Sequence, residues 1–188
     1  MSTKHTIVAL VEDKPGVLNR MASKWRQRGF NIESLAVGHS EIAGLSRMTF
    51  VVDAAMTDVE QVVKQVDKLV DVIHIKDITD APLVARELAL VKVKTTPASR
   101  SEVLQIVDIF RANIVDVTPN SVIVEVTGDE DKVESLLQLL KEYGIIELCR
   151  TGKVAMSRGS NGVTLGLEED EELILPHLEG DRAPGGLY

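Results

Sequence analysis

The sequence predicts an α+β protein built from two successive units, each with the element order βαββαβ. Apolar residues follow strand and helix periodicities in the same order in both halves of the 188-residue chain. Aromatic residues make up only 3% of the chain, so valine, isoleucine and leucine must fill the core, as they do in sheets covered by helices. The regular pattern stops near residue 160, where glycine, proline and acidic residues take over.

The first half is expected to contain four strands and two helices. The first helix follows a Pro-Gly turn, and apolar side chains recur on one face of it, at Val17, Leu18, Met21, Ala22 and Trp25. Thr57 and Glu60 have the capping-box spacing at the start of the second helix. The expected strands lie at about 5–11, 31–38, 46–53 and 71–77, and the helices at 17–28 and 57–69.

The second half repeats this order. Ser99 and Glu102 form a possible capping box before the apolar stripe of the third helix, and the last helix stops before Gly144. The two stripes comprise Val103, Ile106, Val107 and Phe110, and then Val133, Leu136, Leu137 and Leu140. Strands are expected at 88–93, 114–117, 122–126 and 145–149. Each half thus has a ferredoxin-like pattern.

The expected organisation is a first domain at 3–79, a linker at 80–86, a second domain at 87–159 and a mobile acidic tail at 160–188. A unit of ~70 residues has a modest core, so the halves or two chains are expected to pair. In the tail, the acidic run 168–172 is expected to be solvated. The apolar residues 173–175 and Leu178 that follow it are candidates for docking.

Composition excludes several classes of protein. The net charge is 21 − 29 = −8, which disfavours nucleic-acid binding. No apolar stretch approaches the ~20 residues that span a bilayer. A single cysteine excludes an intrachain disulfide, and the first residues fit neither a signal nor a transit peptide. We therefore expect a cytoplasmic protein that binds neither nucleic acid nor membrane.

The sequence offers no convincing catalytic set. The histidines, His5, His39, His74 and His177, lack metal-ligand spacing, and no GxSxG, P-loop or GxGxxG motif is present. Cys149 is expected to be a small core residue. Glu12 and Asp13 form a possible acid–base pair, but neighbours in a loop need not converge on one atom. We expect no catalytic residue and no bound metal or cofactor, although scattered catalytic residues remain an alternative.

The turn before the first helix is the best candidate for a binding site. Gly16 allows a carboxylate to approach the backbone, and Pro15 restricts the shape of the turn. The N–H groups of Gly16, Val17 and Leu18 would be the donors at the helix N-terminus. Asp13 would pair with an ammonium group. Donors for an anion beside a carboxylate for a cation suit a free amino acid.

Asn31 and Ile32 open the next strand, just after Gly29, and are expected at the same end of the sheet as this turn. The Asn31 amide can both donate and accept hydrogen bonds. The alternative is that Pro15-Gly16 is only a turn and Asn31 only a local cap. The combination of the two segments favours binding.

Seven segments carry a resemblance to a known family: VEDKPGVLNR, RGFNIESLAV, LSRMTFVV, KLVDVIHIKDI, RELALVKV, IFRANIVDVTP and TGKVAMSRG. Over about residues 3–159 the chain resembles the small regulatory subunit of acetolactate synthase (acetohydroxyacid synthase), with an N-terminal ACT domain and a C-terminal ACT-like domain. One departure is Asp13, where many members have Asn. The acidic tail after Gly159 is absent from many members.

The resemblance implies a regulatory role without chemistry of its own. The large catalytic subunit of the family uses thiamine diphosphate, Mg²⁺ and FAD, and the small subunit activates it and confers feedback inhibition by branched-chain amino acids, usually valine. Effectors bind between two ACT domains, near the positions matching Asp13, Gly16 and Asn31, which implies a homodimer or a higher homo-oligomer. The alternative is a stand-alone ACT-domain amino-acid sensor that acts on another enzyme or on a transcription regulator.

Overall fold

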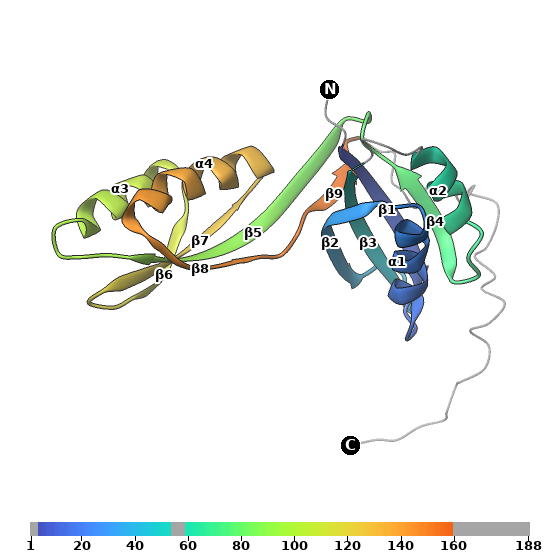
Figure 1. Ribbon diagram of the computed structural model, residues 1–188, viewed down its shortest axis with the longest axis horizontal. Helices are drawn as coiled ribbons and strands as arrows, with labels where there is room; N and C mark the ends of the chain where they lie inside the picture. Colours follow the sequence, from blue (N-terminus) through green and yellow to red (C-terminus); the bar gives the residue numbers. More distant parts are fainter. Residues whose placement is uncertain (1–3, 54–58, 160–188) are drawn as a thin grey trace, which may run out of the picture.

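A computed structural model describes residues 4–53 and 59–159 and shows two lobes joined by one long strand and by a returning segment (Figure 1). Each lobe is a four-stranded antiparallel sheet with two helices on one face. The predicted α+β class with two βαββαβ units is therefore confirmed. The predicted acidic tail lies outside the described residues.

The N-terminal lobe has the strand order β2-β3-β1-β4. Its elements are β1 (Lys4–Glu12), α1 (Val17–Gln27), β2 (Asn31–His39), β3 (Leu45–Asp53), α2 (Val59–Val66) and β4 (Val72–Asp77). β1 lies inside the sheet, between β3 and β4, and its residues from Thr6 to Val11 are all buried. Strand β2 forms one edge of the sheet.

The C-terminal lobe has the strand order β6-β7-β5-β8. Its elements are β5 (Leu83–Lys94), α3 (Arg100–Ile109), β6 (Asn113–Val117), β7 (Ser121–Gly128), α4 (Glu130–Leu140), the 3-10 helix η1 (Lys141–Tyr143) and β8 (Ile145–Arg150). The following strand, β9 (Val154–Ser157), pairs with the first residues of β5 and lies beside the N-terminal lobe (Figure 1). Its core consists largely of valines from β5 and β7 packed against leucines of α4. Gly144 ends η1 with a φ of 95°, a left-handed conformation that favours glycine.

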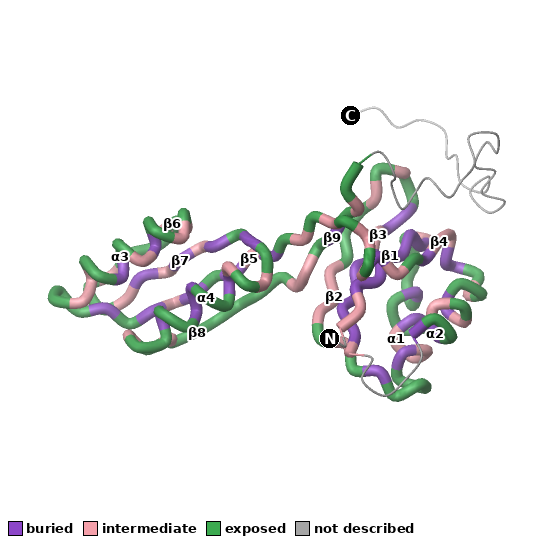
Figure 2. Tube along the Cα trace, turned by 90° about the horizontal axis from the view of Figure 1, so that it is seen from above, coloured by how far each residue is buried: buried purple, intermediate pink, exposed green. Residues whose placement is uncertain are grey.

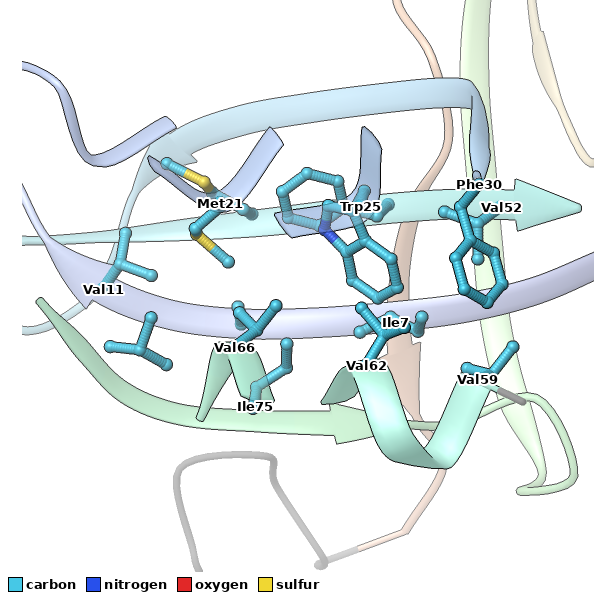
Figure 3. Packing of buried hydrophobic residues seen from close by; sticks show 14 of the residues in the cluster. Ile7, Val11, Met21, Trp25, Phe30, Val52, Val59, Val62, Val66 and Ile75 are labelled. Carbon is cyan, nitrogen blue, oxygen red and sulfur yellow. The ribbon is translucent and has the colours of Figure 1, made fainter. Parts of the chain in front are cut away.

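The core of the N-terminal lobe is built around the only tryptophan (Figure 3). The Trp25 side chain is fully buried, and its ring lies 5.7 Å from that of Phe30 in an edge-to-face arrangement and 5.9 Å from that of Phe50. Val17 and Met21 are buried on the same face of α1, but Leu18 is 38% exposed. The predicted stripe is therefore correct except at its edge.

The cap of the third helix differs from the prediction. Ser99 does not cap the helix with its side chain, so the expected box with Glu102 is wrong. Instead, Thr96 Oγ1 accepts a hydrogen bond from the Ser99 N–H, and Ser99 Oγ accepts one from the Thr96 N–H. This reciprocal pair of hydrogen bonds resembles a capping box, but it lies in the turn at 97–99 that leads into α3. Thr57 of the other expected box lies outside the described residues.

The segment expected to be a linker contains regular structure. β5 begins at Leu83, and its first residues pair with β9, a strand that the sequence analysis did not predict. This two-stranded ribbon packs on the helix-free face of the N-terminal sheet, where Ala155 and Leu83 join Val8 in a small apolar cluster (Figure 1). The ribbon therefore covers apolar side chains on the second face of β1.

Cys149 is exposed, so its expected place in the core is wrong. The reason is that β8 is an edge strand, and its residues after Ile145 are all exposed (Figure 2). Cys149 pairs with Leu90 of β5, on the sheet face that the helices do not cover.

Candidate functional site

The turn between β1 and α1 has the backbone that the sequence suggests. Gly16 adopts a left-handed φ of 88° and precedes α1, which has no side-chain cap at this end. The uncapped start leaves N–H groups for a ligand. Of the three expected donors, the Val17 N–H already bonds to Lys14 O at 3.4 Å, and the Val17 side chain is in the core. Gly16 and Leu18 are therefore the better candidates for donors, beside the exposed Pro15.

Asp13 lies on the surface beside this turn. Its N–H donates to Gly44 O at 2.9 Å, and its Oδ2 lies 3.4 Å from His39 Nδ1, with 49% of the Asp13 side chain exposed. The Glu12 carboxylate points elsewhere and pairs with Lys14 at 2.9 Å. Because the two carboxylates have different partners, the geometry disfavours the acid–base pair and leaves Asp13 accessible to a cation.

The structure adds a cation that the sequence analysis missed. An atom at the Cβ position of Gly16 would lie 3.1 Å from Arg20 Nη1, so this guanidinium stands next to the turn. Arg20 Nε donates to the largely buried Asp71 carboxylate at 2.6 Å, which orients the guanidinium. Arg20 follows Gly16 by four residues, one helical turn, and this spacing is the signal that sequence reasoning had available. Guanidinium groups recognise carboxylates well.

Asn31 is not at the same end of the sheet as the turn. It pairs with Asp53, which in turn pairs with Lys4 at the start of β1, whereas β1 ends at Glu12. The other end of β2, His39, lies near the turn. Eight residue steps of about 3.3 Å put about 26 Å between the two ends of β2. The expected proximity is therefore wrong within one chain, because helix α1 carries the chain back before β2 begins.

Ile32 lies beside Asn31 and packs partly against the core of the N-terminal lobe. The structure thus divides the predicted site residues into two groups. Asp13, Pro15, Gly16, Val17 and Leu18 lie together at one end of the sheet, and Asn31 and Ile32 at the other. Either the groups are unrelated, or two chains must meet to unite them.

A second polar site lies between the lobes. Lys4 Nζ lies 2.9 Å from a Glu33 carboxylate oxygen of β2 and 3.3 Å from one of Glu130 in α4, and Lys153 Nζ lies 2.9 Å from the second Glu130 oxygen. The Lys153 N–H also donates to Ser34 Oγ at 2.8 Å. Hydrogen bonds from Lys153 and Lys4 lower the pKa of Glu130. These contacts join residues far apart in sequence, so sequence reasoning could not find them.

The remaining candidate groups, the histidines and the possible metal ligands, show no arrangement for catalysis or metal binding within the described residues. His5 Nδ1 lies 2.6 Å from Asp77 Oδ2, as expected of a strand histidine with a partner. Among the residues described, no group of three His, Cys, Asp or Glu could hold a metal ion. His177 lies outside them. No helix of the described chain is long and apolar enough to cross a membrane.

Comparisons with known proteins cover both lobes. The model of the ACT domain of AHAS small subunit-like proteins matches residues 7–74, and that of the small subunit of acetolactate synthase matches residues 86–159. A probable acetolactate synthase small subunit of Archaeoglobus fulgidus is 55% identical over 157 residues, which cover 84% of this chain and 98% of that protein. The acetolactate synthase small subunit of Bacillus subtilis is 48% identical over 158 residues, 84% of this chain and 92% of the relative.

A solved structure agrees with these relatives. The crystal structure of an acetolactate synthase small subunit from Thermotoga maritima superposes with a TM-score of 0.76 at 40% identity. The match covers 84% of this chain and 99% of that protein.

Proposed function

Because this chain belongs to the family of acetolactate synthase small subunits, we propose that it is a non-catalytic subunit that binds the large catalytic subunit and raises its activity. In this proposal the chain also confers feedback inhibition by a branched-chain amino acid, with valine as the first candidate. The thiamine diphosphate, Mg²⁺ and FAD of the reaction belong to the large subunit. This chain supplies the effector site.

The single observation that carries the proposal is the position of β2. Strand β2 is an edge of its sheet, and the two halves of the predicted site lie at its opposite ends. Edge strands pair readily with another chain, and a two-fold axis places two β2 strands antiparallel. Antiparallel pairing brings the partner subunit's Asn31 to the end of β2 that carries His39. Asn31 and the turn, which lie about 26 Å apart within one chain, are then in contact between the two chains.

Each group of the united site has a role toward an amino acid. The effector carboxylate accepts hydrogen bonds from the N–H groups of Gly16 and Leu18 and lies near the Arg20 guanidinium. The effector ammonium pairs with Asp13, which is half exposed and weakly engaged by His39 at 3.4 Å. The partner subunit's Asn31 contributes an amide, and the partner's Ile32 contributes apolar surface to the effector side chain. A ligand held by two chains favours one arrangement of the dimer.

This arrangement accounts for control without chemistry. An effector that stabilises one dimer arrangement over another changes how the small subunits bind the large one. A coupling free energy of about 1–3 kcal/mol is sufficient for 5- to 150-fold inhibition. Coupling between two binding equilibria is reciprocal, so the factor by which the effector changes the affinity for the large subunit is also the factor by which the large subunit changes the affinity for the effector.

Reconstitution tests the proposal directly. The isolated chain should have no acetolactate synthase activity but should raise that of the matching large subunit, and valine should reverse the increase. A stand-alone sensor would bind valine without activating the large subunit. Absence of activation at saturating concentrations of both subunits would therefore refute the proposed role.

Gly16→Asp tests the effector site. The new carboxylate would lie beside the Arg20 guanidinium, where the carboxylate of the effector is proposed to bind. We expect valine binding, measured by calorimetry, to weaken at least about tenfold, or about 1.4 kcal/mol, with activation retained. Gly144→Asp is the matched control, since its φ of 95° imposes similar backbone strain in the other lobe. Equal valine affinity in the two variants would contradict the assignment of this turn.

A further inference from the structure

An apolar groove lies between strands β2 and β9, on the helix-free side of the N-terminal sheet. We call it the β2–β9 groove. It has a volume of about 380 Å³ and is lined by Ala36–His39, Arg47, Thr49, Val84, Arg86 and Val154–Met156. Large apolar side chains of β9 remain accessible there: Val154 is 53% exposed and Met156 64%. Within the described residues β9 pairs with β5, and residues of both strands line the groove. Exposed apolar patches of this kind mark interaction sites.

Two arginines give the groove a cationic rim. Arg47 Nη2 donates to Ala155 O at 3.0 Å, and its guanidinium is half-buried. Burial lowers the pKa of Arg47, and the Glu41 carboxylate only partly offsets this effect. The exposed Arg86 bonds to the carbonyl of its neighbour Ala85, and it forms no ion pair within residues 4–53 and 59–159. The groove therefore favours an occupant with apolar side chains next to negative charge.

This chain contains a segment of that chemistry. We propose that residues 168–178, EEDEELILPHL, bind in the β2–β9 groove of the same chain, independently of the effector site. Leu173, Ile174 and Leu175 contact the apolar walls, and the five carboxylates of 168–172 face Arg47 and Arg86. Apolar contacts hold the segment, and the opposite charges set its direction.

Tethering makes this occupant accessible to the groove. The described chain runs along the groove in β9 and ends at Gly159, and eight residues, 160–167, separate it from the acidic run. Eight extended residues reach about 26–29 Å. A short tether between a segment and its site gives an effective concentration on the order of millimolar. The family model ends at residue 159, so the occupant lies beyond the part that the family shares. A second copy of the chain or the large subunit are the competing occupants.

Disulfide trapping in the full-length chain tests the proposal. In a Cys149→Ser background, which removes the exposed native thiol, Val154→Cys is combined with Ile174→Cys. The control pairs Ile174→Cys with Ile109→Cys, which is 76% exposed on α3 of the other lobe. We expect the groove pair to form a disulfide within one chain at least tenfold faster than the control pair. Met156→Cys, at the neighbouring position on the same face, replaces Val154→Cys if that variant folds poorly.

Charge reversal tests the role of the rim. Arg86→Glu in the trapping background should slow disulfide formation at least threefold, as should 1 M salt. Lys76→Glu, at the opposite edge of the same sheet, should leave the rate unchanged within twofold. Equal rates for the groove and control pairs would overturn the proposal. So would a disulfide that joins two chains, because it would make a second copy the occupant, or trapping that requires the large subunit.

Discussion

Gly152 brings the returning segment close to the backbone of β2, and Gly152→Ala tests this contact. A Cβ on Gly152 would lie 2.8 Å from the backbone oxygen of Leu35 and 3.0 Å from Ser34 Oγ. The residue also has a φ of 84°, which side chains other than glycine rarely adopt. Relief of the contact requires the segment to move away from β2, which breaks the 2.8 Å hydrogen bond from the Lys153 N–H to Ser34 Oγ.

The magnitude is the sum of two effects. A left-handed conformation costs an alanine about 1–2 kcal/mol. Loss of the hydrogen bond costs about 0.5–1.5 kcal/mol. We therefore expect Gly152→Ala to lower the free energy of unfolding by about 1.5–3.5 kcal/mol. Gly29→Ala is the control, because its φ is 77° but no atom lies within 4 Å of the added Cβ. It should lose only the backbone contribution.

Urea unfolding followed by circular dichroism measures both variants, and amide hydrogen exchange reports the Lys153 N–H directly. Exchange at Lys153 should accelerate in Gly152→Ala and stay unchanged in Gly29→Ala. The reasoning is refuted if both variants lose the same stability and the Lys153 N–H remains equally protected. That result would mean that the two lobes adjust to the methyl group without parting.

Two further predictions concern the core and the joint between the lobes. Trp25→Ala should lower the free energy of unfolding by about 3–5 kcal/mol in urea titrations, because the side chain is fully buried, and a loss under 1 kcal/mol would contradict its place in the core. Hydrogen bonds from Lys153 and Lys4 lower the pKa of Glu130 in the folded protein below its usual 4.5. The ionised carboxylate therefore stabilises the fold above about pH 4.5, and this stabilisation is lost as the pH falls through the lower pKa of the folded state. The stability difference between wild type and Glu130→Gln should therefore shrink below that pH, whereas Glu134→Gln, whose side chain is 65% exposed, should show little change.

Local patterns predicted most of the elements. The apolar stripes of α1 and α4 and the glycine stop at Gly144 agree with the structure because they depend on residues within one or two turns. Predictions failed where a neighbour in space decided the outcome. Cys149 looks like a core residue in an apolar strand, but β8 is an edge.

The candidate site was only half predictable. The Pro-Gly turn, with its positive φ at Gly16, follows from the local sequence. The position of Asn31 could have been deduced as well. β1 and β2 run parallel on either side of β3, and a helix that connects two parallel strands returns the chain to the starting end of the sheet. The Arg20 guanidinium beside Gly16 depends on its bond to Asp71, a residue distant in sequence. The boundaries of the two domains, and the binding roles of the site residues, stay predictions.

The sequence by itself determined the two βαββαβ units, the apolar stripes and the Pro-Gly turn before α1. These features depend on short-range periodicity and on residues with special backbone freedom. Only the tertiary structure decided which strands are edges and that β9 returns to cover the N-terminal sheet. Those outcomes depend on pairing between strands far apart in the chain, and the local sequence does not determine which strands pair or in which register.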